Sequence, residues 1–158
     1  MVQLHPDVEQ LAFLLGTWRG EGSGRYPTID PFTYREEIAF EHVGDAFLLY
    51  RGSSWAPDGS PLHFERGFLR PGGAGEVELC LAHPLGLTEV AHGRVSGGSI
   101  RLRTREDGAV VRTRTGPAVT ALERRYVVED ASLVYEVDME MEGTPLVLHT
   151  TSRLRRDG

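Results

Sequence analysis

The chain has 158 residues, a formal net charge of −6 at pH 7 and one cysteine, Cys80. This length accommodates one domain with a hydrophobic core and is too short for two. The negative charge argues against nucleic acid as a partner, because phosphate binding requires a concentrated positive field. No apolar segment reaches transmembrane length, the N-terminus lacks the regions of a signal peptide, and a single cysteine forms no internal disulfide. These features predict one domain over residues 1–158, a cytoplasmic location and no association with membranes.

The N-terminal segment predicts one short helix. Pro6 and Asp7 are typical of helix starts, and Gly16 is placed to end the helix. The helix is too short to form a domain, so its apolar face is expected to close one end of a barrel. Helical spacing places these residues on that face: Val8, Leu11, Ala12 and Leu15.

From Thr17 onward, short extended segments alternate with turn residues. In 133–141 every odd residue is apolar and the even positions from Glu136 onward are acidic. One face of this strand is therefore expected to be buried and the other exposed to solvent. The turn signals divide the chain into about ten strands. The pattern predicts an all-β fold, a single antiparallel up-and-down β-barrel in which no strand edge stays exposed. Residues 105–118 are weakly patterned and are expected to form a mobile loop beside the barrel mouth.

A barrel of this size holds one small ligand at its mouth, while side chains fill the rest of its interior. Large apolar residues are the candidates for this interior, and core packing is the simplest role for most of them. They are Phe40, Phe47, Phe64, Phe68, Tyr135, Met139 and Met141.

The most informative motif is the run 16–24, Gly-Thr-Trp-Arg-Gly-Glu-Gly-Ser-Gly. Gly20, Gly22 and Gly24 share one face of an extended strand, which offers bare backbone to a neighbouring strand or to a flat ligand. Together with the tail Tyr-Pro-Thr-Ile at 26–29, the run resembles the Gly-x-Trp-x-Gly-x-Gly signature of the nitrobindin family. Members of that family are small calycin-like β-barrels, similar to fatty-acid-binding proteins, that bind haem b.

The resemblance extends over nearly the whole chain. Further similar stretches are 62–68, 81–86 and 119–125. Nitrobindins carry the histidine that binds iron in the last strand, shortly before a basic C-terminus, and His149 has this position here. The resemblance therefore implies that His149 is the proximal haem ligand. Strand alternation alone does not decide whether His149 faces inward, because a bulge or a mouth buried on both faces would break the pattern.

The resemblance implies a cofactor-binding role for several other residues. Thr28 resembles the family position that touches the porphyrin, although a hydroxyl at a strand end also bonds its own backbone. Gly20 and Gly22 have no side chains and would leave space for the cofactor. His63 and His83 lie in stretches that border the haem pocket, and an unligated polar residue is the simpler role for both.

Strand parity gives the two histidines different expected positions. His83 shares parity with Leu81 and is expected to face inward at the mouth, whereas His63 has the opposite parity to Leu62 and is expected at the rim.

One departure from the family concerns the haem propionates. Nitrobindins often have a basic residue just before the strand that begins at Val119, but this chain has Thr-Gly-Pro-Ala at 115–118. Propionate contacts are therefore expected from Arg112 or Arg114, or from water.

The resemblance implies one haem b per chain, with iron bound to His149 and an open sixth position. The implied activity is isomerisation of peroxynitrite to nitrate by ferric haem, with nitric oxide as a second small ligand. Two alternatives are a carrier of a fatty acid or another small hydrophobic molecule, and a haem protein that senses or stores nitric oxide. A Soret band in the purified protein separates haem binding from lipid carriage. A homodimer stays open as an alternative to a monomer.

Overall fold

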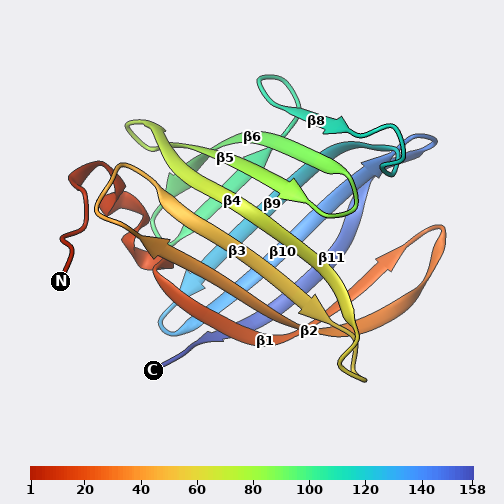
Figure 1. Ribbon diagram of the computed structural model, residues 1–158, viewed down its shortest axis with the longest axis horizontal. Helices are drawn as coiled ribbons and strands as arrows, with labels where there is room; N and C mark the ends of the chain where they lie inside the picture. Colours follow the sequence, from red (N-terminus) through yellow and green to blue (C-terminus); the bar gives the residue numbers. More distant parts are fainter.

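The computed structural model describes residues 1–158 and contains one closed β-barrel with a short N-terminal helix (Figure 1). This confirms the predicted fold class. The helix is too short to cross a membrane. In chain order the elements are η1 (Pro6–Leu14), β1 (Gly16–Tyr26), β2 (Ile29–His42), β3 (Leu48–Trp55), β4 (Pro61–Gly73), β5 (Glu76–His83), β6 (Leu87–Ser96), β7 (Ser99–Arg103), β8 (Ala109–Arg112), β9 (Val119–Glu129), β10 (Ser132–Met141) and β11 (Thr144–Arg156).

Ten of the eleven strands form the barrel wall. Their order is β5-β4-β3-β2-β1-β11-β10-β9-β7-β6, and the pairing of β5 with β6 closes the ring. All the paired strands are antiparallel. Closure satisfies the backbone groups that an open sheet would leave at its edges. The prediction of about ten strands in an up-and-down barrel is therefore confirmed.

The eleventh strand, β8, lies in the segment that was expected to be a loop. It pairs with the first half of β6, from Leu87 opposite Arg112 to Val90 opposite Ala109, whereas β7 pairs with the second half of β6. The loop prediction was wrong here because β6 extends beyond β7 and offers free hydrogen-bonding groups to this segment. β8 lies at the top of the barrel in Figure 1.

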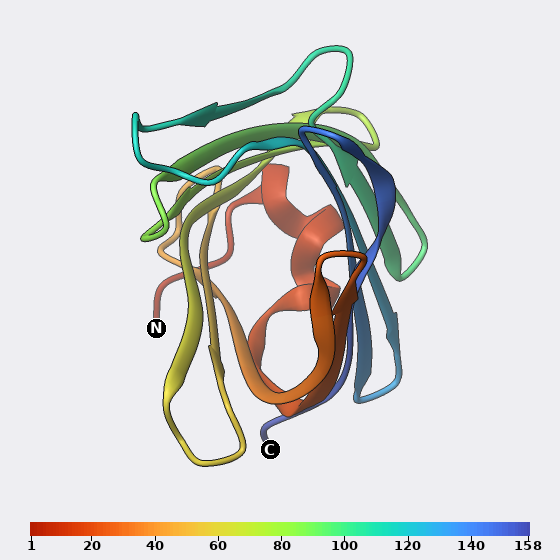
Figure 2. The ribbon, with the colours of Figure 1, turned by 90° about the vertical axis from the view of Figure 1, so that its right-hand side faces the viewer.

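The helix η1 closes one end of the barrel, as expected. Figure 2 looks into the opposite end and shows η1 across the far side. Val8, Leu11 and Leu14 are fully buried, and their spacing of three matches the three residues per turn of a 3₁₀-helix. The α-helical spacing used for the prediction correctly selected Val8 and Leu11, but it missed Leu14 and added Ala12 and Leu15, which are only half-buried.

Inward and outward residues alternate as predicted in β10, where Leu133, Tyr135 and Val137 are buried. Phe40 is also buried, and the half-buried Met139 and Met141 pack against the core.

The interior positions predicted for Phe47, Phe64 and Phe68 were wrong. Phe68 is 46% exposed and packs against Phe47 on the outside of the barrel, with ring centroids 5.4 Å apart. Phe64 lies on the same outer face of β4 and contacts Trp55. The inner and outer faces of β4 were exchanged in the prediction because its first inward-facing residues, His63 and Glu65, are polar or charged.

The glycine face of β1 allows its neighbours to approach closely. A Cβ at Gly20 would overlap the carbonyl of Arg153 on β11, and one at Gly22 would lie 2.5 Å from the hydroxyl of Ser152 and overlap the ring of Tyr34. The face is therefore covered by adjacent strands and their side chains, which was one of the two interpretations of the motif.

Candidate functional site

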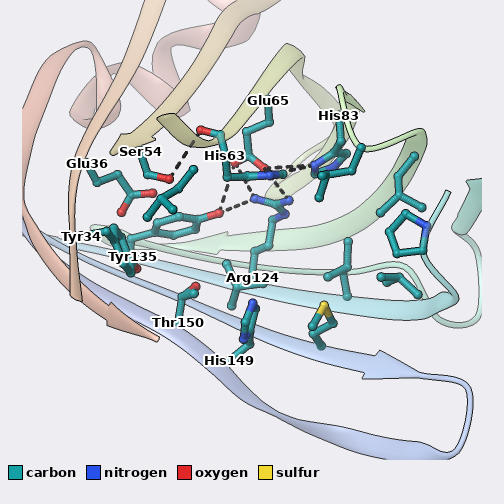
Figure 3. A pocket seen from close by; sticks show the side chains of 18 of the residues that line it. Tyr34, Glu36, Ser54, His63, Glu65, His83, Arg124, Tyr135, His149 and Thr150 are labelled. Atoms are coloured by element: carbon teal, nitrogen blue, oxygen red, sulfur yellow. Dashed lines mark hydrogen bonds and ion pairs between the residues drawn. The ribbon is translucent and has the colours of Figure 1, made fainter. Parts of the chain in front are cut away.

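A cavity of about 260 Å³ lies at the mouth of the barrel, at the opposite end from η1 (Figure 3). Much of its wall is apolar, which suits a hydrophobic ligand. The apolar lining residues are Phe32, Leu62, Leu85, Leu87, Pro117, Val119, Leu122, Val137, Met139 and Met141. The polar side chains converge from several strands: Tyr34, Glu36, Ser54, His63, Glu65, His83, Arg124, Tyr135, His149 and Thr150.

His149 lies in a β-bulge of β11. The register with β10 places Val137 opposite Thr150 and the next residue, Asp138, opposite Leu148, so His149 is the extra residue. The bulge reverses the alternation of β11 and lets both His149 and Thr150 line the cavity. This confirms the bulge, one of the two irregularities that the sequence analysis considered, and explains why parity could not place the ring.

A backbone hydrogen bond fixes the tautomer of His149. Its Nδ1 lies 3.0 Å from the carbonyl oxygen of Arg25, which can only accept, so Nδ1 carries the proton and donates it. The lone pair is therefore on Nε2. The ring packs edge-on against Tyr26 and Phe32, at centroid distances of 5.4 and 6.1 Å. An imidazole whose second nitrogen donates to a carbonyl is typical of metal-binding histidines.

Deeper in the barrel, Arg124 of β9 forms ion pairs with two buried carboxylates. Its Nη1 donates to Glu65 at 2.8 Å, its Nη2 to the other oxygen of Glu65 at 3.0 Å, and its Nε to Glu89 at 3.2 Å. Burial alone would raise the pKa of both carboxyls, but the guanidinium holds the pKa of Glu65 well below its usual range and also lowers that of Glu89. Both carboxyls are therefore ionised at neutral pH.

Glu36 has a different environment. It accepts a hydrogen bond from the hydroxyl of Ser152, and Arg124 acts on it only at longer range. Burial raises the pKa of Glu36 to about 7. The cavity wall therefore contains a carboxyl group that exchanges a proton near neutral pH.

His63 and His83 form a hydrogen-bonded pair above Arg124 in Figure 3. Nδ1 of His83 lies 3.0 Å from Nε2 of His63, and Nε2 of His83 lies 2.8 Å from Glu89. His83 is buried and faces inward, as its parity with Leu81 predicted. His63 is half-buried at the cavity, which agrees with the expected rim position.

The structure does not bring all the expected residues together. Thr28 is exposed at the tip of the hairpin between β1 and β2, and it does not line the cavity. Gly20 and Gly22 are also absent from the lining. Contacts of these three residues with a cofactor stay predictions. Arg112 and Arg114 are exposed on and just after β8, and their contact with propionates is likewise untested.

Sequence reasoning missed the buried charges. Glu89 alternates with Leu87 and Ala91, which both face inward, and Arg124 alternates in the same way with Leu122 and Tyr126. This alternation with inward-facing apolar residues was the sequence signal that could have identified Glu89 and Arg124 as buried.

Comparison with known proteins agrees with the geometry of the site. Residues 7–156 match the family model of the THAP4-like heme-binding beta-barrel domain. The chain belongs to this family. The peroxynitrite isomerase 2 of Mycobacterium marinum is 49% identical over 156 residues, which cover 97% of this chain and 96% of that protein. The peroxynitrite isomerase of Nocardia farcinica is 47% identical over 158 residues, with 99% and 94% covered.

A solved structure confirms the family at the level of the fold. The crystal structure of Rv2717c from M. tuberculosis superposes with a TM-score of 0.94 at 45% sequence identity, and the match covers 99% of this chain and 100% of that one. The resemblance to the nitrobindins is therefore confirmed for this haem-binding barrel.

Proposed function

We propose that this haem-binding barrel takes up one haem b through Nε2 of His149 and isomerises peroxynitrite to nitrate. The observation that carries the proposal is the position of His149. Its ring lines an apolar cavity at the mouth while a backbone carbonyl holds its Nδ1 proton. The similarity to proteins named peroxynitrite isomerase, at 47–49% identity over nearly the full chain, supports the reaction.

The residues around His149 orient its imidazole. The hydrogen bond to Arg25 keeps the proton on Nδ1, and the flanking rings of Tyr26 and Phe32 restrict rotation of the imidazole. Nε2 is then the ring nitrogen that is left to bind iron. β11 supplies this residue at a bulge opposite β10, next to Thr150, the last position at which β11 pairs with β1.

The other residues of the cavity set its polarity. When bound, ferric haem supplies an iron at which peroxynitrite can rearrange to nitrate. The apolar side chains, such as Leu122 and Met139, exclude water from this space. Glu36 retains a proton on about half of the molecules near neutral pH, which reduces the negative charge that faces an anionic substrate.

Carriage of a fatty acid is not favoured. A fatty-acid carboxylate entering the barrel would need a free cation, but Arg124 is already paired with Glu65 and Glu89. Glu36 adds a third carboxyl on the same wall. Repulsion from these groups would oppose a carboxylate headgroup in this interior.

Turnover measurements test the proposed reaction. The haem-loaded protein is mixed with peroxynitrite, its absorbance decay is followed, and nitrate and nitrite are measured. We expect faster decay, with nitrate formed in excess over protein. The His149→Ala variant should lose this acceleration, and the matched variant His92→Ala, outside the cavity, should keep it. Haem-loaded protein that leaves both the rate and the nitrate yield unchanged would contradict the proposed reaction and leave a sensor or storage role for nitric oxide.

A further inference from the structure

Three ligand-type side chains converge on the wall of the cavity that faces His149. His63 and Glu65 come from the start of β4, and His83 ends β5 (Figure 3). We propose that His63, Glu65 and His83 bind one divalent transition-metal cation, at a site separate from the haem-binding position at His149. The proposal does not rest on the proposed isomerase activity, because β4 and β5 supply the three ligands and β11 supplies none of them.

The distances between the three ligand atoms fit a common ion. Nε2 of His63 lies 3.0 Å from Nδ1 of His83 and 3.4 Å from Oε2 of Glu65, and Nδ1 of His83 lies 3.6 Å from the same carboxylate oxygen. Bonds of about 2.1 Å to one ion separate neighbouring ligand atoms by about 3.0 Å in octahedral and about 3.4 Å in tetrahedral geometry. The three atoms therefore occupy one face of a coordination shell before any ion is present.

The surrounding residues orient His83 and Glu65 as ligands for a cation. Nε2 of His83 is 2.8 Å from a carboxylate oxygen of Glu89, so this nitrogen donates to Glu89 and leaves Nδ1 as the acceptor of the ring. A carboxylate that accepts from the far nitrogen is the usual partner of a metal-binding histidine. Arg124 donates to both oxygens of Glu65 and Tyr50 donates to Oε1, so the carboxylate is held in a fixed orientation. With the proton of His83 on Nε2, the 3.0 Å contact has Nε2 of His63 donating to Nδ1 of His83, so binding a cation at both nitrogens requires the His63 proton to move to its half-exposed Nδ1.

The charge balance of the interior also favours a cation. Glu65 and Glu89 carry two negative charges, and Arg124 is the one guanidinium paired with them. Uncompensated charge is costly in a dry interior, so a divalent cation beside Glu65 would relieve the excess.

The donor set defines the class of metal. Two imidazole nitrogens and one carboxylate oxygen suit Zn²⁺, Fe²⁺ and similar first-row ions, whereas Ca²⁺ and Mg²⁺ prefer oxygen-only shells. The three ligands leave further coordination positions open, and His63 and His83 line the cavity. A small anion in the cavity could therefore reach the cation.

Titration calorimetry with Zn²⁺ tests the site directly, using the full chain with and without haem after removal of metals by a chelator. We expect one Zn²⁺ per chain in both forms. His63→Ala removes a half-exposed ligand and should weaken binding by at least about tenfold, as should His83→Ala. Thermal melting of each variant checks that it is folded.

Two matched variants separate this site from the other histidines. His149→Ala should bind Zn²⁺ as the wild type does, even where it no longer takes up haem, and His92→Ala should also leave binding unchanged. Loss of Zn²⁺ binding in His149→Ala would place the metal at β11 and overturn the proposal. Absence of binding in the wild type, or equal binding in folded His63→Ala, would show that the cluster is only a hydrogen-bonded network.

Discussion

Two kinds of carboxyl group lie within this barrel, and their neighbours decide their charge. Glu65 and Glu89 accept from Arg124 and stay ionised, whereas burial raises the pKa of Glu36 to about 7. In the unfolded chain all three are ordinary carboxyls. Folding therefore lowers the proton affinity of two of them and increases that of the third, which gives each a distinct dependence of stability on pH.

Glu36→Gln tests this difference. Because the pKa of Glu36 is raised on folding, from 4.5 to about 7, its contribution to stability is largest at low pH and is lost as the pH rises through this interval. Glutamine mimics the protonated acid and can still accept from Ser152. We expect the variant to be more stable than the wild type by on the order of 3 kcal/mol at about pH 8, and by about 1 kcal/mol or less at about pH 5.

Urea unfolding of both proteins at the two pH values gives the free energies. The lowered pKa values of Glu65 and Glu89 stabilise the fold above the ordinary pKa of a carboxyl group, and this stabilisation is lost as the pH falls below it. Both residues are present in wild type and variant, so their contributions cancel in the difference. A difference in stability that is the same at both pH values would show that Glu36 does not titrate as described.

At the scale of elements, η1 and the bulge in β11 are the two irregular parts that shape the barrel. The helix closes one end with a stripe of residues spaced by three, and its last turn is tied to β1 by a hydrogen bond of 2.7 Å from Nε1 of Trp18 to the carbonyl of Leu14. The bulge directs His149 into the opposite end. The 3₁₀-helix has a shorter repeat than an α-helix, and the bulge adds one residue to β11. The regular α-helical and strand patterns therefore predict the wrong inward-facing side chains in both elements.

Leu14→Ala and Leu15→Ala form a matched pair that tests the geometry of η1. The 3₁₀ spacing buries Leu14 completely and leaves Leu15 half-buried, whereas α-helical spacing would select Leu15. We expect Leu14→Ala to lower the free energy of unfolding by about 2–5 kcal/mol through the cavity that it creates, and Leu15→Ala to cost clearly less. Chemical denaturation measures both, and the reverse order would contradict the helix geometry.

At the scale of the whole molecule, the barrel has a closed end packed with apolar side chains and an open end where polar and apolar side chains line a cavity. Val8, Leu11 and Trp18 are fully buried around the closed end. His149 and Met139 at the mouth are only half-buried. The fold can therefore place charged and ligand-binding groups at the mouth while the closed end supplies hydrophobic stabilisation.

The sequence predicted the regular parts of this arrangement and part of the site. Alternation in β10 and β5 indicated strands with one buried face, because their inward residues are apolar. The same reasoning failed on β4, where His63 and Glu65 face inward and Phe64 faces out. The burial of Glu65 depends on Arg124, 59 residues away in the chain, and no local pattern reports such a pairing. The resemblance to a family selected His149, but the carbonyl of Arg25 that orients it is a backbone group without a sequence signature.

Titration of the metal-depleted protein with ferric haem, followed by absorbance, tests the central claim most directly. We expect the wild type to saturate at one haem per chain with a five-coordinate ferric spectrum, and His149→Ala to lose most specific binding. The variant should stay folded because a half-buried position at the mouth contributes little to the core. His63→Ala, which keeps the proximal ligand, serves as the matched control and should bind haem. A wild-type ferric spectrum in His149→Ala would contradict the account and move the ligand to His63 or His83.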